Sequence, residues 1–570
     1  MVVGLPAIAA RGYTGGVTTL QLAGRIAGTR NGGLRSYRRE LLAATLVTAL
    51  VALLLVLLGP APGDAPAHLY RTLLVHDGAF LWDNLWYAGN YPLASYSLLY
   101  YLPAAAVGNL PLVFAAAVAS TALFCSIAYR EWGEHALWPC RAFGVLAAAP
   151  IFTGLYSYSL GFTAMLAAIR AIQVGRLWLA LPLAALTFGF SPLAFVFLCL
   201  ILAAVVIAQR RVTRRTLLVG AGVAVTAAFG LAVMLIFPTG GVYSFNPVDF
   251  GCVLATCTAG ALLARRTPHA RFIFVFFVLW GLVSIFCYLV PTPVGDNVTR
   301  LSAFVFPLVL VTAAMARFRP RLLVLVALGG ALAYNIVPYF ILIPYRLDPR
   351  PATERFWAPA VTYLTERSGP SYRVEVVPTA AHWEAYWFPK ASLPLARGWY
   401  RQLDMADYPV LFKHSLSAAT YERWLRETGV RYVLVPATKL DPNGGPVEAR
   451  IVRSGQTSLR AVSTTSTGTV YELPHATGMI TGPAPAALTV LDHASVEGWV
   501  AAPGTYRLRL RYSPYWEVRP AGACVRRAAD DMMDIALPSA GGFSVRFPDD
   551  VGAVLSRVAS SSPASARCPA

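Results

Sequence analysis

Eleven long apolar runs interrupt the sequence, and they constrain the fold more than any other feature does. Most approach the roughly 17 to 25 residues that an α-helix needs to cross the hydrocarbon core of a bilayer. The runs cover 41–59, 101–128, 142–155, 157–173, 177–190, 193–209, 216–237, 250–264, 272–290, 301–316 and 321–343. Four of the middle runs are short and two of these can be re-entrant, so the count carries an error of about two. The pattern predicts a polytopic α-helical membrane protein with about 11 transmembrane helices.

The charge pattern supports a membrane protein and argues against a nucleic-acid binder. Of 570 residues, 56% are hydrophobic and only 13% are charged, which does not fit one soluble globular protein. The formal net charge is +19, but much of the positive charge stands in short arginine clusters between apolar runs, as in cytoplasmic membrane loops. Such clusters lie at 25–39, 210–215, 265–271 and 317–321. We therefore expect contact with a lipid bilayer and none with nucleic acid.

A cytoplasmic N-terminus places the basic loops on one side of the membrane. Alternation then puts five basic loops inside and, with an odd number of spans, the C-terminal region outside. The five loops are 130–141, 170–176, 210–215, 265–271 and 317–321. Residues 1–40 are expected to be a flexible cytoplasmic segment without a signal peptide, because no small-residue cleavage site follows the first apolar run. The predicted location is a bacterial inner membrane, since Arg-over-Lys and Ala-rich usage is associated with GC-rich bacterial genomes.

After the last apolar run the composition changes, and we expect two extracytoplasmic domains. Residues 344–483 show helix and strand patterns of an α/β domain, and 484–557 read as a β-rich, sandwich-like domain. The tail 558–570 is of low complexity and is expected to be disordered. Cys524 and Cys568 are the only cysteines after the last span. They pair if this region is exported and stay free otherwise, and the sequence leaves both states open.

The first outer loop, 60–100, carries the first candidate site. Asp64, His68 and Arg71 follow at i, i+4 and i+7, so a helix starting near Pro66 places His68 and Arg71 on one face with Asp64 at its cap. The Asp64 carboxylate can act as a general base or bind a divalent metal ion. Arg71 offers a planar fork to phosphate, and His68 can protonate a leaving phosphate. The alternative is an interfacial loop whose charges are only solvated.

The same loop continues with polar and aromatic residues that are candidates for substrate binding: Asp83, Asn84, Trp86 and Tyr91. Its aromatic rings can stack on sugars or form the belt that Trp and Tyr build at lipid headgroups, and for most of them the belt is favoured. A second candidate site starts the tenth span at its outer end, with Asp296, Asn297 and Arg300. An arginine there breaks the positive-inside pattern and can hold a lipid-linked phosphate.

These segments resemble a known family. A first span followed by Asp64 and PAHLYRTL, then LWDNLWYAGNYPL, is similar to bacterial proteins of the 6-pyruvoyl-tetrahydropterin synthase-related membrane class, a name that denotes no pterin chemistry. More broadly the arrangement resembles the C-type glycosyltransferase superfamily, which takes lipid-linked sugars and has a catalytic acid in the first outer loop. VGDNVTRL and LARGWYRQLD (395–404) look like motifs of actinobacterial members. The resemblance implies that Asp64 is the acidic position.

The chain departs from this family in one respect, since many C-type enzymes carry a tight acidic pair in the first loop. Here the next acids, Asp77 and Asp83, are well separated from Asp64. The use of a divalent metal as cofactor is therefore left open.

The resemblance implies an inverting glycosyltransferase that moves a sugar from a polyprenyl-phosphate donor to a cell-wall glycan acceptor on the outer face. Asp64 is then base or metal ligand, and His68, Arg71 and Arg300 manage the phosphate. The alternatives are a transporter or flippase of a lipid-linked precursor and a non-catalytic envelope-assembly protein. A transporter is expected to show mid-membrane charges and an internal repeat, neither of which is clear in this sequence.

Overall fold

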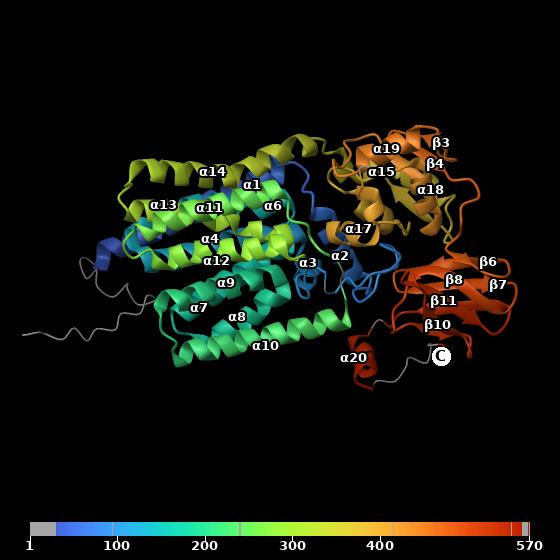
Figure 1. The fold of residues 1–570 in the computed structure, drawn as a ribbon, viewed down its shortest axis with the longest axis horizontal. Coiled ribbons are helices and arrows are strands. Elements are labelled where there is room, and N and C mark those ends of the chain that lie inside the picture. The colour runs from blue at the N-terminus through green and yellow to red at the C-terminus, as the bar shows by residue number, and fades with distance from the viewer. Residues whose placement is uncertain are drawn as a thin grey trace, which may run out of the picture.

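The computed structural model describes residues 30–93, 95–238, 241–413, 415–548, 550–560 and 568. Its N-terminal part is a bundle of helices that run side by side, with the C-terminal domains at one end (Figure 1). The bundle contains α1 (Arg30–Leu58), α4 (Asn109–Trp132), α5 (Leu137–Leu146), α6 (Ala149–Thr153), α7 (Tyr156–Gln173), α8 (Leu177–Phe190), α9 (Pro192–Gln209), α10 (Arg214–Ile236), α11 (Pro247–Arg265), α12 (Arg271–Leu289), the 3₁₀ helix η3 (Gly295–Phe304), α13 (Val305–Met315) and α14 (Arg321–Arg346). The predicted helical class of this part is confirmed.

Eight helical stretches in the described ranges are long and apolar enough to cross a membrane. Three of the eleven expected spans do not form a separate membrane-crossing stretch by these criteria. The run 142–155 joins α4 in one stretch that turns at Gly133, α8 has only 14 residues, and α7 carries polar residues at both ends. The count of eleven crossing helices therefore stays a prediction.

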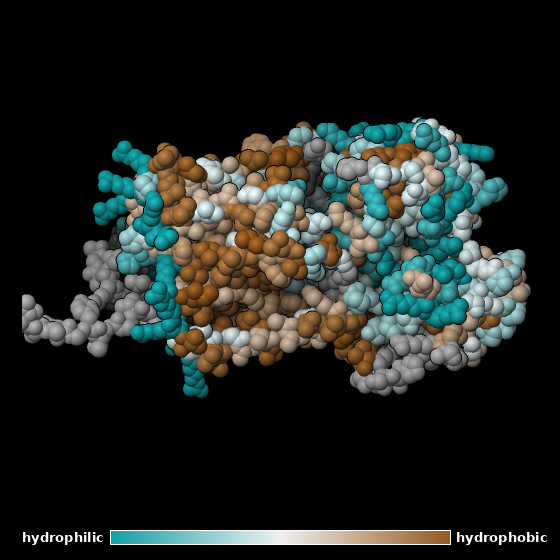
Figure 2. All heavy atoms as spheres, viewed as in Figure 1, coloured by the Kyte–Doolittle hydropathy of each residue, from teal (hydrophilic) through white to brown (hydrophobic). Residues whose placement is uncertain are grey.

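The surface of the bundle agrees with a membrane environment. Figure 2 shows an apolar band along the bundle and hydrophilic residues at the end remote from the C-terminal domains. Beyond the arginines of their first turns, α10 and α14 expose large apolar side chains, including Phe229, Leu235, Leu322 and Leu325. The loop between α13 and α14, which carries Arg317 to Arg321, lies at that remote end (Figure 1). The basic loop and the C-terminal domains thus occupy opposite ends of the bundle.

Two short helices connect the bundle to the C-terminal domains. They are α2 (Ala65–His76) and α3 (Tyr101–Val107), both within or next to the first outer loop. A proline in the first turn of α2 explains its start, because proline lacks the N–H that a first turn leaves unbonded. The predicted helix near Pro66 is confirmed.

The first C-terminal domain has a four-stranded sheet in the order β1-β2-β4-β3. β1 (Arg373–Val376) and β2 (Val430–Pro436) are parallel, whereas β4 (Gly468–Glu472) is antiparallel to β2 and to β3 (Arg460–Thr464). The helices and 3₁₀ turns of this domain are η4 (Arg350–Ala352), α15 (Glu354–Thr365), α16 (Glu384–Lys390), α17 (Arg401–Asp407), η5 (Pro409–Phe412), α18 (Ala418–Glu427) and α19 (Gly445–Arg453). This is an α/β arrangement.

The second C-terminal domain contains two four-stranded sheets that share one core, as in a sandwich. Their orders are β10-β11-β8-β5 and β6-β7-β12-β9. The strands are β5 (Ile480–Thr481), β6 (Ala486–Leu491), β7 (Ser495–Val500), β8 (Gly504–Arg511), β9 (Glu517–Arg519), β10 (Cys524–Arg527), β11 (Met532–Leu537) and β12 (Gly541–Arg546), followed by α20 (Val551–Ser560). In β8, Tyr506, Leu508 and Leu510 are buried at alternate positions, as a half-buried strand requires.

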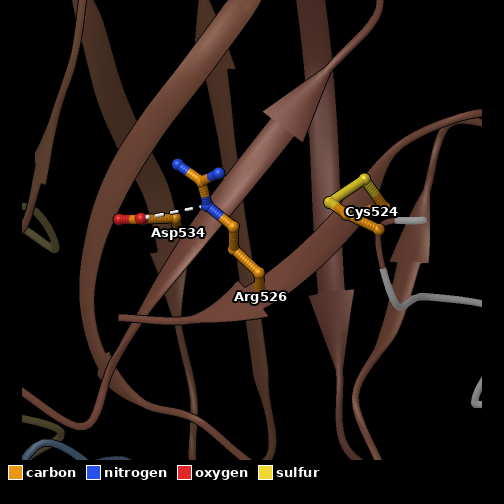
Figure 3. The surroundings of a disulfide bond; sticks show 4 residues. Cys524, Arg526 and Asp534 are labelled. Atoms are coloured by element: carbon orange, nitrogen blue, oxygen red, sulfur yellow. Dashed lines mark hydrogen bonds and ion pairs between the residues drawn. A yellow bond between two sulfur atoms is a disulfide. The ribbon is translucent and has the colours of Figure 1, made fainter. Parts of the chain in front are cut away.

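A disulfide ties the end of the chain to the sandwich. Cys524 on β10 pairs with Cys568 across 44 residues, with sulfur atoms 2.03 Å apart. In Figure 3 the bond stands beside Arg526, whose Nε lies 3.3 Å from an Asp534 carboxylate oxygen on β11. Of the expected disordered tail, 558–560 belong to α20 and Cys568 is held covalently, while 561–567 and 569–570 lie outside the described residues. In the expected flexible N-terminus, 1–29 also lie outside, and α1 begins at Arg30 rather than at 41.

The first outer loop belongs to two hydrophobic cores at once. Trp86 and Tyr87 are buried in a core shared with the α/β domain, and Trp82 and Tyr91 in the core of the sandwich. We call residues 81–91 the aromatic joint, because they fasten both C-terminal domains to the bundle. The predicted membrane belt of these rings is wrong, since they are covered by protein.

Candidate functional site

Asp64 and Arg300 meet at the end of the bundle that faces the C-terminal domains. A carboxylate oxygen of Asp64 lies 3.8 Å from Nη2 of Arg300, although 236 residues separate them in the chain. Their side chains are 22% and 26% exposed. A loose, partly exposed pair of this kind contributes only about 0–1 kcal/mol to stability. Both groups are therefore available to a ligand.

The backbone of Asp64 is fixed by the end of α6. The Asp64 N–H donates to the Thr153 carbonyl at 3.1 Å. Gly154 packs directly beneath, and its positive φ of 87° is a conformation that favours glycine. Asp64 occupies the predicted N-cap position of α2, but its side chain makes no capping hydrogen bond. Its carboxylate keeps its lone pairs for other partners.

Replacing Gly154 by alanine is expected to disturb this corner. A Cβ there would lie 2.5 Å from the Ala65 nitrogen and 2.9 Å from the Asp64 nitrogen, closer than real contacts allow. Gly78→Ala is the matched control, because Gly78 has φ +74° but no atom within 4 Å of its added Cβ. The left-handed backbone alone destabilises either variant by about 1–2 kcal/mol. Thermal unfolding should show a larger loss for Gly154→Ala, and equal losses would contradict tight packing under Asp64.

The backbone carbonyls of Arg300 and Val298 are held by hydrogen bonds, while the Arg300 side chain makes the loose ion pair with Asp64. The Tyr158 hydroxyl donates to the Arg300 carbonyl at 3.0 Å, and the Trp280 indole donates to the Val298 carbonyl at 3.1 Å. Asp296, four residues earlier, has one buried carboxylate oxygen without a hydrogen-bond partner in the described residues. Asn297 is half-buried and its N–H donates to the Val294 carbonyl. Of the predicted second cluster, Arg300 is the residue that contacts Asp64.

Phenols from distant segments surround the pair. Tyr96 interacts electrostatically with both Asp64 and Arg300, as does Tyr243. The Tyr96 and Tyr400 rings pack in a tilted arrangement with their centres 4.7 Å apart. Burial raises the pKa of Tyr400 to about 12 and also raises the pKa values of Tyr96 and Tyr243. These hydroxyls stay protonated at neutral pH and can donate hydrogen bonds to an anion. Tyr400 was not predicted as a site residue, although it lies in the LARGWYRQLD segment.

His68 does not act as a charged group. It is buried among Tyr96, Tyr100, Tyr101 and Tyr156, and its Nδ1 lies 3.1 Å from the Tyr101 hydroxyl. Burial, together with the positive charges of two arginines, lowers the pKa of His68 to about 3. The imidazole is therefore neutral, which disagrees with the predicted transfer of a proton to a leaving phosphate.

Arg71 is also turned inward. It is 2% exposed, donates to the Pro92 carbonyl and lies 3.4 Å from the Asn90 side-chain oxygen. Its guanidinium stands 4.8 Å from the centre of the Tyr400 ring. Its Nε is buried without a hydrogen-bond partner in the described residues, and its two terminal nitrogens face residues 90–92 of its own loop, so the predicted phosphate contact stays a prediction.

The other four predicted binding residues lie in or beside the aromatic joint and face protein. Asp83 accepts from the Tyr70 hydroxyl at 2.9 Å and lies 3.0 Å from His493, and the Asn84 amide donates to the Asp492 carbonyl. The Trp86 indole donates to Ala385, and Tyr91 donates to Ser513. All four residues are buried. They build domain contacts, which disagrees with the predicted substrate binding.

The described residues contain no group of three or more His, Cys, Asp and Glu that could hold a metal ion. The nearest charged partner of Asp64 is the Arg300 cation, which disfavours a divalent ion beside that carboxylate. The residues present do not fit a resident metal ion.

No protein-family model matches the sequence, and a search of curated proteins finds no significant similarity. The family resemblance therefore stays a prediction, and the geometry of the Asp64–Arg300 site carries the functional argument.

Proposed function

We propose that the chain is a membrane glycosyltransferase that moves a sugar from a polyprenyl-phosphate donor to a cell-envelope acceptor. The observation that supports this most is the meeting of an accessible carboxylate and an accessible guanidinium at the end of an apolar bundle. A lipid-linked donor requires a polar site at the end of an apolar bundle, because its lipid tail lies among the helices while its phosphate and sugar lie at the membrane surface. The C-terminal domains stand above this end and are suited to hold the acceptor.

In the proposed reaction Asp64 acts as general base. The acceptor hydroxyl attacks the anomeric carbon, its proton passes to the Asp64 carboxylate, and the bond from that carbon to the phosphate oxygen breaks. The Arg300 guanidinium pairs with the phosphate as its negative charge grows. Because the two side chains are in loose contact at 3.8 Å, a donor can separate them at little energetic cost. The phenols of Tyr96 and Tyr243 supply further donors near the phosphate.

The proposed orientation has the C-terminal domains outside the cell and the arginine-rich loops inside. The α13–α14 loop lies at the end of the bundle remote from these domains, as the positive-inside rule requires. The Cys524–Cys568 disulfide is in the C-terminal part, and such bonds persist mainly in oxidising compartments.

The test is a strain that lacks this chain and carries wild type, Asp64→Asn or Asp64→Ala. Both variants should lose the same envelope glycosidic linkage, since removal of a general base slows a reaction by about 10²–10⁴-fold. The readout is the sugar composition and linkage of the envelope glycans, with membrane levels of each variant shown to be equal. Asp77→Asn is the control, because Asp77 lies in the same loop and is 43% exposed.

A non-catalytic assembly role is the second candidate, and the buried aromatic joint favours it. Most aromatic residues of the first outer loop hold domains together, as a scaffold for envelope partners would require. In that case the glycan profile stays unchanged with Asp64→Asn, while deletion of the whole chain still produces an envelope defect.

A further inference from the structure

An open groove with a volume of about 920 Å³ lies between the α11–α12 and α13–α14 loops. These loops are at the end of the bundle remote from the proposed active site (Figure 1). Four arginines line it together with Pro268, Pro320, Met315 and Ala316: Arg266, Arg317, Arg319 and Arg321. The lining contains no acidic residue. Within the described ranges none of these four guanidinium groups forms an ion pair or a side-chain hydrogen bond. A concave site whose positive charge is not balanced by acidic residues favours the binding of an anionic ligand.

The backbone of the groove is held in an unfavourable conformation. Arg317 and Phe318 have φ values of 52° and 54°, in the left-handed region where glycine is preferred. They close the C-terminus of α13 through hydrogen bonds from Arg317 to Ala314 and from Phe318 to Ala313. A glycine would make this turn at a lower free energy, by about 1–2 kcal/mol per residue. Side chains are therefore kept at this turn at a cost in backbone free energy.

An apolar face continues from the arginines along the bundle. Phe318 is 49% exposed, and on α14 Leu322 and Leu325 are 76% and 69% exposed. Figure 2 shows that the hydrophilic end of the bundle borders directly on its apolar band. A ligand in the groove thus meets positive charge at its polar end and an uncovered hydrocarbon surface beside it.

We infer that this groove binds the headgroup of an anionic phospholipid from the leaflet at this end of the bundle. Its phosphate pairs with Arg317, Arg319 and their neighbours, and its acyl chains lie along α14. Basic pockets between helices on the cytoplasmic side are known to suit such headgroups. The inference needs a bilayer around the bundle but is independent of the proposed glycosyl transfer.

The α9–α10 loop offers a closely matched control. Arg210 also ends its helix with a left-handed φ of 55°, and Arg211 follows it, both exposed. This loop lies at the same end, because Arg271 at the start of α12 donates to the Ile207 carbonyl at 3.4 Å. Neither Arg210 nor Arg211 lines the groove. The substitutions Arg210→Gly and Arg211→Gln thus remove the same charge from the same kind of turn.

The experiment titrates full-length protein in neutral detergent with phosphatidylglycerol and counts bound lipids by native mass spectrometry. The groove variant Arg317→Gly with Arg319→Gln should bind this lipid roughly thirtyfold more weakly, at about fivefold for each arginine removed. The control variant should stay within about threefold of wild type, since Arg210 and Arg211 do not line the groove and exposed charges that make no direct contact are screened by salt. Phosphatidylcholine should bind all three proteins alike.

Three results would overturn the inference. Equal losses in the groove and control variants would indicate diffuse surface charge, and undiminished binding by the groove variant would remove the site altogether. Displacement of the lipid by millimolar inorganic phosphate would assign the groove to a soluble phosphate ligand. Because Arg317→Gly relieves the strained turn, the variant should melt no lower than wild type. If the double variant nevertheless fails to fold, Arg317→Gly alone is measured, with a fivefold loss expected.

Discussion

Replacing Arg397 by methionine is expected to lower the free energy of unfolding of the C-terminal region by about 3–5 kcal/mol. Arg397 is buried in the α/β domain between two carboxylates that are each 1% exposed. It donates to Glu375 from Nε at 3.0 Å and to Glu448 from Nη1 at 3.0 Å and Nη2 at 2.8 Å. Without the guanidinium, two buried carboxylates lose their shared cation. The loss is far larger than for a surface pair, because neither carboxylate can turn to water.

The variant should also show a pH dependence with a definite sign. Burial raises the pKa values of Glu375 and Glu448 even in the presence of Arg397. In the variant both carboxyls bind protons more tightly when folded than when unfolded, so its stability should fall as pH rises above the ordinary glutamate pKa of about 4.3. Chemical unfolding in detergent, followed by tryptophan fluorescence at several pH values, measures both effects.

Arg526→Met serves as control for this prediction. Arg526 is 63% exposed and lies 3.3 Å from Asp534 on the sandwich surface (Figure 3). Its removal should change stability by less than about 1 kcal/mol. An equally small loss for Arg397→Met would mean that water reaches the Glu375 and Glu448 carboxylates, contrary to their burial.

Replacing Trp86 by alanine is expected to lower the free energy of unfolding by about 3–5 kcal/mol and to loosen the aromatic joint. The ring is fully buried, and its indole nitrogen donates to the Ala385 carbonyl at 3.0 Å. The Gly398 backbone lies against the ring so closely that a Cβ there would be 2.4 Å from it. The variant leaves a cavity and an unpaired carbonyl where the first outer loop meets the α/β domain.

Limited proteolysis of membranes provides the measurement for Trp86→Ala. Cleavage near residues 81–91 should become faster, and the glycan linkage assigned to Asp64 should weaken because the loop that carries Asp64 moves. Trp178→Ala is the control, since Trp178 is 74% exposed on α8 and packs against little protein. Identical cleavage patterns for the two variants would show that the joint does not depend on Trp86.

Local patterns allowed much of the fold to be predicted. Every expected apolar run contains a helix, because the hydrophobic period and length are encoded within each run. Within the predicted α/β domain, the pattern of AATYERWLRETG at 418–429 predicts a helix and the apolar run 430–435 a strand. The structure has α18 at Ala418–Glu427 and β2 at Val430–Pro436. The differences of one or two residues are ordinary at element ends.

The candidate site could be predicted only in part. The residues Asp64 and Arg300 were singled out because each is a charge at the outer end of an apolar run, and the structure brings them together. The burial of Arg71 could not be foreseen, because its partner ring Tyr400 lies more than 300 residues later. The contact between Trp86 and Ala385 could not be foreseen either, because 299 residues separate them in the chain. A short segment shows which side chains it contains but not which distant surface will cover them.

The aromatic joint has a consequence for how the chain is made. Trp86 leaves the ribosome 299 residues before its partner Ala385. At about 5–20 residues per second, roughly 15–60 seconds of synthesis separate them. During this interval Trp82, Trp86, Tyr87 and Tyr91 lack the C-terminal surfaces that cover them in the folded chain. The loop is therefore expected to bind chaperones, and to be accessible to quality-control proteases, until the C-terminal domains have been synthesised. A nascent chain arrested before Ala385 is expected to be degraded.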